Sequence, residues 1–542
     1  MKTLIKNGIV IDGTGKPAFP ADVLVEDDRI IDIILRPSDN STPLRPSSSP
    51  TSQSSCPTPA PAADGTVEIV DATGCLVTPG FIDAHSHSDA YLVLEPDAPS
   101  KITQGVTTEI NGQCGGSVAP RYGEARLSSD WASLLGDRLT WRSLAEYRAV
   151  LADAKPAVNT VQFVGHNTLR SSVVGYAPRT ASADELRRMS RLLEQALDEG
   201  GWGLTTGLVY QPGRYSTPEE VVALAKLAAA KGGYYATHMR SEGDRILEAI
   251  DEVVGLVRAT GIRAEISHLK TSGPRNWHKL DAVLDRIERA MAAGLLLGSD
   301  RYPYCAAGTD LDVILPDWAQ VGAAKGETER LSDPRQRAQI IDEINASDRD
   351  WASVMIGGTW SSENRIFSGK TIAEILGRSR SPGELVCEIL LRDGCKTGAF
   401  FFGMSEENLA KIYSRPWIIP GSDASLRAPQ GPLGADHPHP RAYATMPEFY
   451  RRVRALGRSR EETVARMTSA AAERFGIRGR GRIEKGAYAD LVVWREAEFQ
   501  ARATFDAPHR FTEGVKCVLV NGVIPYRDGQ FTGRRGGRFL ER

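Results

Sequence analysis

The sequence predicts an α/β protein: a (β/α)8 TIM barrel with a small β-sandwich module built from both chain ends and an inserted lid-like subdomain. Two observations support this fold class. From Cys75 onward, short apolar segments alternate with helical patterns of about 10 to 18 residues, which is typical of βα units around a parallel sheet. At both chain ends, by contrast, β-prone segments are separated only by Gly and Asp turns.

The barrel is expected from the number of strand candidates. Eight short apolar segments occur in the alternating region, and eight parallel strands suit a closed (β/α)8 barrel. They cover residues 80–85, 106–110, 160–164, 203–206, 234–238, 263–268, 295–299 and 417–422.

Two helix starts support the alternation. Ser182 is followed by Glu185, and Thr217 by Pro218 and Glu220. Each pairs a capping hydroxyl with a carboxylate three residues on, so we expect two backbone N–H groups to be satisfied at each start. The second helix leads into residues 234–238, which places a histidine at the carboxyl end of a strand, where barrel enzymes have their active sites.

The remaining segments divide the chain. Residues 1–78 are predicted to form the N-terminal part of the β-module and residues 479–542 its C-terminal part. Ser, Thr and Pro dominate residues 37–65, so this stretch is expected to be a disordered loop. The barrel would comprise residues 79–310 and 415–478, with a helix over 460–475. Residues 311–414 are too long for a simple connection and read as the inserted subdomain, with helices over 333–346 and 382–391.

Composition excludes several classes of protein. The 66 Lys and Arg residues nearly balance 68 Asp and Glu residues, so no basic arm for nucleic acid or patch for a membrane is expected. No segment approaches the ~18 apolar residues that span a bilayer, and the first residues lack the pattern of a signal peptide. Seven scattered cysteines argue against a disulfide framework and favour a cytoplasmic location.

The first candidate for chemistry is a pair of histidines. Asp83, His85 and His87 alternate along a predicted strand and would therefore share one face. Two adjacent imidazoles suit Zn²⁺, which accepts nitrogen ligands at about 2.0–2.1 Å. A pair of histidines in the core is the alternative, because His-x-His alone is a weak signal.

Four more residues strengthen the metal prediction. His238 and His268 each end a predicted strand, whereas Cys114 and Asp423 each directly follow one. The carboxyl ends of barrel strands lie on one rim, so these side chains would gather there with the first two histidines. The alternatives are a small buried hydrophobe for Cys114 and a helix cap for Asp423.

Several motifs resemble those of a known family. The segment Gly80-Phe-Ile-Asp-Ala-His-Ser-His87 resembles the first signature of the amidohydrolase superfamily, and Gly112-Gln-Cys-Gly-Gly-Ser-Val-Ala-Pro120 that of its N-acyl-D-amino-acid deacylase (D-aminoacylase) branch. Arg301 departs from the branch, in which an apolar residue is expected. Further similar motifs are Gly165-His-Asn-Thr-Leu-Arg170, Asp300-Arg-Tyr-Pro-Tyr304, His439-Pro-Arg441 and Gly486-Ala-Tyr-Ala-Asp-Leu-Val-Val493.

The resemblance implies a set of roles. Cys114, His238 and His268 would hold one tightly bound zinc ion, and a second, weaker or empty position would lie between His85, His87 and Asp423. Asp423 would act as the general base. Lys270 and Tyr210, and more weakly Arg441, would bind the substrate carboxylate, with surface solvation as their alternative.

The function expected from these roles is zinc-dependent hydrolysis of N-acyl-D-amino acids, small molecules that would yield a carboxylate and a free D-amino acid. One alternative is a cyclic-amide hydrolase of the hydantoinase or dihydroorotase type, or an amidohydrolase acting on another N-acyl substrate. Cys114 favours the deacylase, because the cyclic-amide enzymes commonly have a bridging lysine carbamate at the comparable place. A metal-free binding protein on the same fold is the other alternative.

Overall fold

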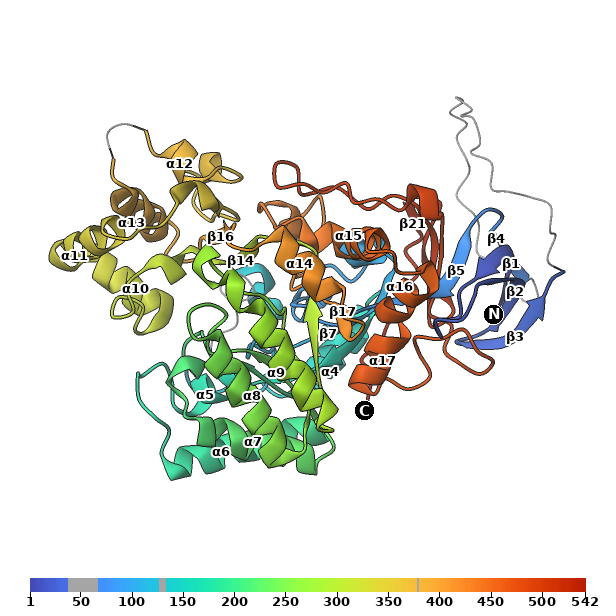
Figure 1. Ribbon diagram of the computed structural model, residues 1–542, viewed down its shortest axis with the longest axis horizontal. Coiled ribbons are helices and arrows are strands. Elements are labelled where there is room, and N and C mark those ends of the chain that lie inside the picture. Colours follow the sequence, from blue (N-terminus) through green and yellow to red (C-terminus); the bar gives the residue numbers. More distant parts are fainter. Residues whose placement is uncertain (38–66, 126–132, 378–379) are drawn as a thin grey trace.

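A computed structural model describes residues 1–37, 67–125, 133–377 and 380–542 (Figure 1). The loop predicted over 37–65, with Cys56, lies outside the described residues except for residue 37. Within the described ranges, no helix combines the length and apolarity needed to cross a membrane.

The predicted barrel strands are present and all pair in parallel. β17, β13, β12, β11, β10 and β9 form a six-stranded sheet in that order, and β6, β7 and β8 form a three-stranded one. Only one residue separates β8 from β9, and Ala84 N donates to Pro420 O at 3.1 Å, which joins β6 to β17. Their bounds are β6 Phe81–Asp83, β7 Val106–Asn111, β8 Asn159–Gln162, β9 Val164–Gly165, β10 Gly203–Gly207, β11 Tyr234–His238, β12 Arg263–Ile266, β13 Leu297–Arg301 and β17 Ile418–Pro420.

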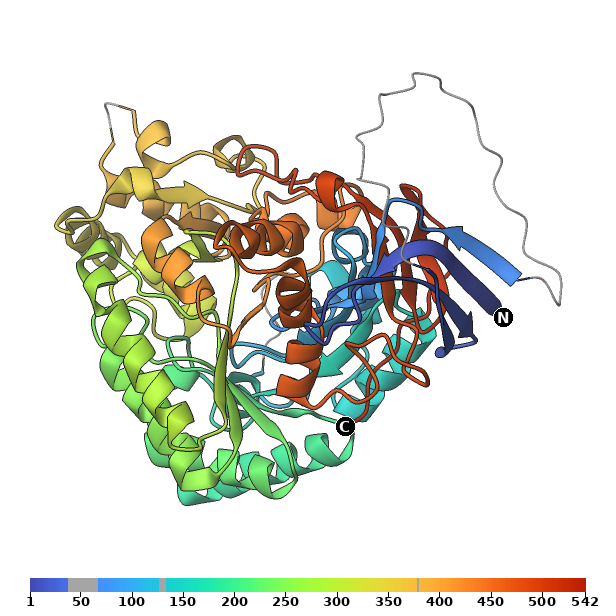
Figure 2. The same ribbon diagram turned by 45° about the vertical axis from the view of Figure 1, so that its right-hand side comes forward.

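Helices alternate with these strands and cover them from outside (Figure 2). Their apolar faces join the strands in one large core that includes Leu193, Leu224 and Ile250. Their bounds are α1 Tyr91–Leu94, α2 Pro99–Ile102, α4 Leu144–Ala154, α5 His166–Val173, α6 Ala183–Asp198, α7 Pro218–Ala230, α8 Ile246–Thr260, α9 Leu280–Ala292, α14 Glu406–Tyr413, α15 Arg441–Ala455, α16 Arg460–Met467 and α17 Ser469–Phe475.

Two helix predictions need correction. At α6 the reciprocal cap is confirmed, but at α7 only Thr217 caps, because the Glu220 side chain turns inward to Arg170 instead. The single helix predicted over 460–475 is divided into α16 and α17. Thr468 separates them with φ −135° and ψ −89°, which lie outside the helical region.

The two chain ends join in one β-module, as predicted, and its strands form a mixed sheet. β18 (Leu491–Trp494) pairs antiparallel with β5 (Leu76–Pro79), and this joins the C-terminal strands to the N-terminal ones. A separate apolar core lies on this sheet, with Ile5, Val23 and Leu519 among its members. The other strands are β1 Lys2–Val10, β2 Phe19–Glu26, β3 Arg29–Leu35, β4 Val67–Asp71, β19 Val515–Val520, β20 Val523–Arg527 and β21 Gln530–Phe531.

The segment between β13 and β17 forms its own layer on the side of the molecule away from the terminal sheet (Figure 1). It has an antiparallel sheet in the order β14-β16-β15 and a core of its own around Leu331, Ile356 and Leu390. Its elements are β14 Ala307–Asp310, β15 Val354–Ile356, β16 Gly398–Phe401, α10 Ala323–Ser332, α11 Pro334–Asn345, α12 Ile372–Ile375 and α13 Pro382–Arg392.

Candidate metal centre

The carboxyl ends of the parallel strands bring the predicted ligands together. Cys114 follows β7, and its Sγ lies 3.3 Å from His85 Nε2 and 3.4 Å from His268 Nε2. The ligand atoms form two groups that share this sulfur, and within each group all atoms lie within 4.8 Å of one another. One group holds Cys114, His238 and His268, and the other holds Cys114, His85, His87 and Asp423.

Three of these residues have an unusual backbone. Cys114, His268 and Asp423 have φ angles of 51°, 38° and 50°, in the left-handed region that side chains with a Cβ seldom adopt. Each comes two or three residues after a strand end, where the chain turns sharply. Gly207 permits this turn at Cys114, because a Cβ there would lie 2.1 Å from the Cys114 carbonyl oxygen. Strain of this kind is found mainly at functional sites.

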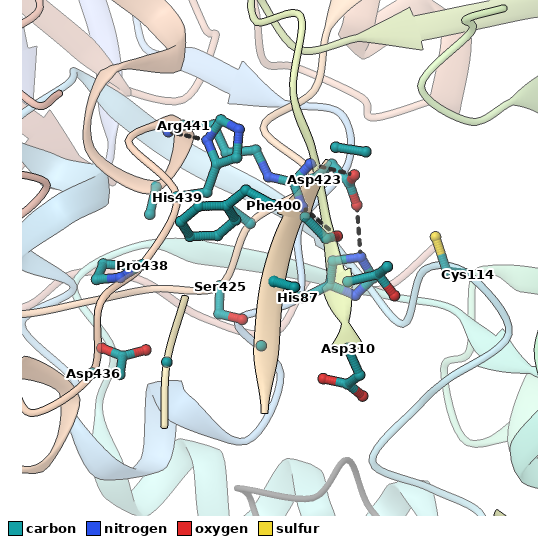
Figure 3. Close-up of a pocket in the computed structure, with 18 of the residues that line it drawn as sticks. His87, Cys114, Asp310, Phe400, Asp423, Ser425, Asp436, Pro438, His439 and Arg441 are labelled. Atoms are coloured by element: carbon teal, nitrogen blue, oxygen red, sulfur yellow. Dashed lines mark hydrogen bonds and ion pairs between the residues drawn. The ribbon is translucent and has the colours of Figure 1, made fainter. Parts of the chain in front are cut away.

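Asp423 lies between His87 and Arg441 (Figure 3). Its Oδ1 is 3.1 Å from His87 Nε2 and 3.4 Å from His85 Nε2, and its Oδ2 accepts from Arg441 Nη1 at 2.8 Å. Burial alone raises the pKa of Asp423, but the charges of Arg441 and His268 and the hydrogen bond from His87 outweigh it. The pKa of Asp423 is therefore well below its ordinary value, which favours the ionised carboxylate.

Neighbouring charges also lower the pKa of Cys114, whose sulfur both groups share. Burial raises the pKa of Cys114, but the charges of His85 and His268 outweigh this effect and hold that pKa well below its ordinary value. For His85, burial lowers the pKa, but the charges of Asp300 and Cys114 raise it by more than burial lowers it. The pKa of His85 is therefore well above its ordinary value. The site thus favours the thiolate, which is the form of cysteine that binds metals.

The donors suit a zinc ion. Among the described residues, His238 Nδ1 is buried and has no hydrogen-bond partner, so this nitrogen is available as a ligand. One thiolate and two imidazoles are donors that tetrahedral zinc accepts, and a site with three protein ligands retains a position for water. The residues present therefore fit a zinc ion.

Carboxylates behind the histidines orient them, and sequence reasoning gave these carboxylates no role. Glu242 Oε1 lies 2.9 Å from His268 Nδ1, while Asp300 Oδ2 lies 3.3 Å from His85 Nδ1. Such partners fix the ring orientation of metal-binding histidines. Asp300 directly follows the strand predicted over 295–299 and lies one residue before the end of β13, so the rule that identified Asp423 would also have identified it. Glu242 follows His238 by four residues, beyond any strand.

The three predicted carboxylate-binding residues line one cavity of about 780 Å³ with His87, Cys114, His238, His268 and Asp423, whereas His85 is fully buried beneath it. Lys270 Nζ donates to Glu242 at 2.5 Å, and Tyr210 Oη lies 3.4 Å from Thr309 Oγ1. Arg441 is held by Asp423. Both cations are thus already paired with carboxylates inside the cavity.

Three further residues from the sequence motifs, His439, His166 and Arg301, differ in whether they line the cavity. His439, from the motif His439-Pro-Arg441, lines the cavity, and its Nε2 lies 3.1 Å from Ala306 O. His166, from the motif that begins at Gly165, is buried outside the cavity lining, with its Nε2 2.8 Å from Glu220 Oε1. Arg301 is buried away from the cavity lining, with its guanidinium 3.9 Å from the ring centre of Tyr302.

Fold and site together define a class: an α/β protein with a buried thiolate–imidazole–carboxylate cluster at the ends of its parallel strands, as in metal-dependent hydrolases. The chain belongs to the amidohydrolase family, whose sequence model matches residues 68–308 and 419–526.

Full-length relatives narrow the comparison. The N-acyl-D-glutamate deacylase of Alcaligenes xylosoxydans xylosoxydans is 33% identical over 99% of this chain and 96% of its own. A D-aminoacylase with a binuclear metal centre, studied for one-metal activation and second-metal attenuation, is 32% identical with a TM-score of 0.79, covering 100% of this chain and 99% of its own. The N-acyl-D-glutamate deacylase of Bordetella bronchiseptica, complexed with zinc and a phosphonate inhibitor, is 31% identical with the same TM-score and coverage.

Proposed function

We propose that this chain is a zinc-dependent deacylase that hydrolyses the amide bond of N-acyl-D-amino acids to a carboxylate and a free D-amino acid. One observation carries the proposal: the sulfur of Cys114 is shared by two groups of ligand atoms, one of which includes Asp423, at the base of a single cavity. The full-length likeness to N-acyl-D-glutamate deacylase and D-aminoacylase supports the reaction and the D configuration.

The ligands are assigned by their surroundings. We assign one tightly bound zinc ion to Cys114, His238 and His268, because the thiolate form is favoured and His238 Nδ1 lacks another partner. His85, His87 and Asp423 would frame a weaker second position. When bound, zinc polarises the scissile carbonyl and lowers the pKa of a water molecule to about 7.

Asp423 is assigned the proton transfers. Its carboxylate accepts a proton from the attacking water as the water oxygen bonds to the carbonyl carbon. It then donates that proton to the amide nitrogen as the carbon–nitrogen bond breaks, so that the amine leaves neutral. His87 and Arg441 hold the two carboxylate oxygens, which keeps the accepting lone pairs oriented toward the cavity.

Substrate binding is assigned to the cations and the phenol of the cavity. Lys270 and Tyr210 would donate to the substrate carboxylate, and Arg441 would contribute its positive charge. Because Glu242 already pairs with Lys270, the substrate carboxylate would join an existing ion pair and approach an ammonium that is fixed in place. A preorganised donor loses less side-chain entropy when the substrate binds.

The test is a panel of N-acetyl D- and L-amino acids, assayed while zinc is measured by atomic emission. We expect hydrolysis of D-substrates by protein that carries about one zinc ion per chain. A hydantoin and dihydroorotate serve as cyclic-amide comparisons. Zinc-loaded protein that hydrolyses only the cyclic amides would replace this proposal with the cyclic-amide alternative, and zinc-free protein without hydrolysis would remove both.

We also propose how the chain is divided into a barrel, a β-sandwich and a lid-like subdomain. The parallel strands are assigned to one closed (β/α)8 barrel, supported by the hydrogen bond from Ala84 to Pro420 and by the single residue between β8 and β9. The terminal sheet is assigned as a β-sandwich around its own core. Residues 311–414 are assigned as a lid-like subdomain, because Lys396 and Phe400 from this segment line the cavity.

A further inference from the structure

A buried ionic cluster lies beneath the metal centre, on side chains that the proposed reaction does not use. Lys101 of α2 donates through Nζ to Asp83 Oδ2 at 2.8 Å and lies 3.0 Å from Glu109 Oε1. All three side chains are at most 1% exposed. Two carboxylates therefore share one ammonium in a dry interior, which is costly to maintain and calls for a specific reason.

The Lys101 ammonium also contacts two segments of the metal centre: the turn that carries Asp423 and the segment between His85 and His87. Lys101 Nζ donates to Ser422 Oγ at 3.1 Å and to Ala424 O at 3.0 Å, the two residues on either side of Asp423. It also donates at 3.1 Å to the hydroxyl of Ser86, which lies between His85 and His87 in the sequence.

Asp83 and Glu109 hold the same two segments by further hydrogen bonds, and the cluster of Lys101, Asp83 and Glu109 is called the clamp below. Asp83 accepts from Ser422 N at 2.8 Å and from Ser422 Oγ at 2.6 Å. Glu109 Oε1 accepts from the hydroxyls of Ser86 and Ser88, each at 2.6 Å. The strand end before His87 and the turn around Asp423 are thus tied to the same three charges. Within the part of the chain that the structure describes, the Lys101 ammonium forms no hydrogen bond or ion pair with Cys114, His238 or His268.

The clamp accounts for the unfavourable backbone conformation of Asp423. Its left-handed φ of 50° is unfavourable for a residue with a Cβ and persists only where neighbouring contacts impose it. The hydrogen bonds at Ser422 and Ala424 hold the peptides on both sides of that residue. In addition, the cluster has one formal negative charge in excess, and such a charge favours a cation bound nearby.

We propose that Lys101, with Asp83 and Glu109, is a positioning cluster that sets Asp423, His85 and His87 relative to one another, and so supports proton transfer and the weaker metal position selectively. The tight site of Cys114, His238 and His268 does not depend on it. This inference rests on the proposed function for its kinetic part, but its metal-binding part can be measured without any turnover.

The experiment compares Lys101→Met and Ser422→Ala with wild-type zinc-loaded protein. Ser422→Ala removes one hydroxyl and leaves the three charges in place, so it tests the clamp even if Lys101→Met fails to fold. Arg480→Met is the matched control, because Arg480 is 7% exposed and pairs with Asp490 beside the terminal sheet, away from the cavity. The measurements are zinc per chain, Co²⁺ titration of the second position by visible absorbance, kcat and KM.

We expect both test variants to keep about one zinc ion per chain and a KM within about twofold, while kcat and the affinity for added Co²⁺ fall by about 10- to 100-fold, as is typical for residues behind metal ligands. Arg480→Met should change neither quantity. The inference is overturned if Co²⁺ affinity is unchanged in Ser422→Ala, or if the control loses as much as the test variants. A wild-type protein without hydrolysis would refute the deacylase proposal and leave the Co²⁺ comparison decisive for the clamp.

Discussion

Cys114, His268 and Asp423 place their side chains on the metal centre from a left-handed backbone. Glycine or asparagine would fit this conformation better, but neither supplies a thiolate, an imidazole or a carboxylate. The position of each side chain therefore depends on the surrounding hydrogen bonds, such as that from His268 N to Asp300 Oδ1 at 2.9 Å. We expect substitutions at these three positions to affect the site more than the stability of the fold.

Asp423→Asn should separate catalysis from metal binding. The amide is similar in size to the carboxylate but accepts a proton far less readily. We expect kcat to fall by about 10²- to 10⁴-fold, the usual contribution of a general base, with zinc content unchanged. Steady-state kinetics and atomic emission on the same sample measure both quantities. Turnover equal to that of the wild type would exclude Asp423 as the base.

Cys114→Ala should have the opposite effect. Without the thiolate the tight site has only two imidazole donors, so zinc per chain should fall from about one to well below one after dialysis. Cys387→Ala is a suitable control, because it removes a thiol from the separate core of the segment between β13 and β17, where Cys387 is buried. Full zinc occupancy in Cys114→Ala would contradict its role as a ligand.

At the residue scale, the sequence predicted the side chains that directly follow strands. It did not predict the side chains that hold these residues in place. His238 and Asp423 are visible because a strand end is legible in the sequence. Lys101 is not, because its partners Asp83, Glu109 and Ser422 come from three separate strand ends and meet only after folding. The engagement of Arg441 by Asp423 depends on the same kind of long-range contact.

Within the segment between β13 and β17, two acids face each other in a buried position. Asp312 follows β14, and Glu327 lies in α10. Burial, strengthened by the charge of Asp312, raises the pKa of Glu327 to about 9, and burial raises that of Asp312 to about 6. Both groups therefore hold protons in the folded state at pH values where the unfolded chain has released them.

This pair predicts a pH dependence of stability. Its contribution is fully present below the unfolded pKa of about 4.5 and is lost as the pH rises through the folded pKa of about 9. Glu327→Gln cannot ionise, so the variant should be more stable than wild type at pH 8 and its advantage should shrink toward pH 5. Urea unfolding at several pH values measures this difference.

Glu329→Gln provides the matched control, because Glu329 lies in the same helix with an exposed side chain. We expect its unfolding midpoint to follow that of the wild type at every pH. A constant difference between Glu327→Gln and wild type from pH 5 to pH 8 would show that the buried pair does not titrate in this range.

At the scale of elements, most boundaries agree with the sequence prediction because local signals set them. The cap at Ser182 is one example. One error arises where a long-range contact overrides the local pattern, because Glu220 leaves its own helix start to pair with Arg170. The other lies at Thr468, where the chain leaves the helical conformation between two segments that are both helical in composition.

For the whole molecule, metal removal should lower thermal stability. Zinc bound only by the folded state adds RT ln(1 + [L]/Kd), about 2.7 kcal/mol when free zinc is 100 times Kd. For a domain of about 300 residues, with an unfolding entropy of about 2.1 cal/mol/K per residue, this corresponds to a melting temperature lower by about 4 °C after chelation. Calorimetry of chelated and zinc-restored samples tests it. Equal melting temperatures would mean that the metal makes no net contribution to folding.

At this scale, the sequence predicted the parallel strands and that both chain ends join in one β-module. It did not predict the strand order within the sheet of that module, where β4 and β5 both pair with β1 and only β5 contacts β18. Nor did it predict an antiparallel sheet in the segment between β13 and β17. Pairing between distant strands depends on packing, which composition and periodicity do not encode.

The pairing of β5 with β18 also concerns how the protein is made. β5 leads directly into β6, which is followed by His85, but its neighbour β18 is synthesised roughly 400 residues later. At about 5 to 20 residues per second, the ribosome needs on the order of 20 to 80 seconds to produce that neighbour. During this interval the apolar strand edge at Leu76 and Val77 stays uncovered, so the nascent chain is a natural client for chaperones that bind exposed strands.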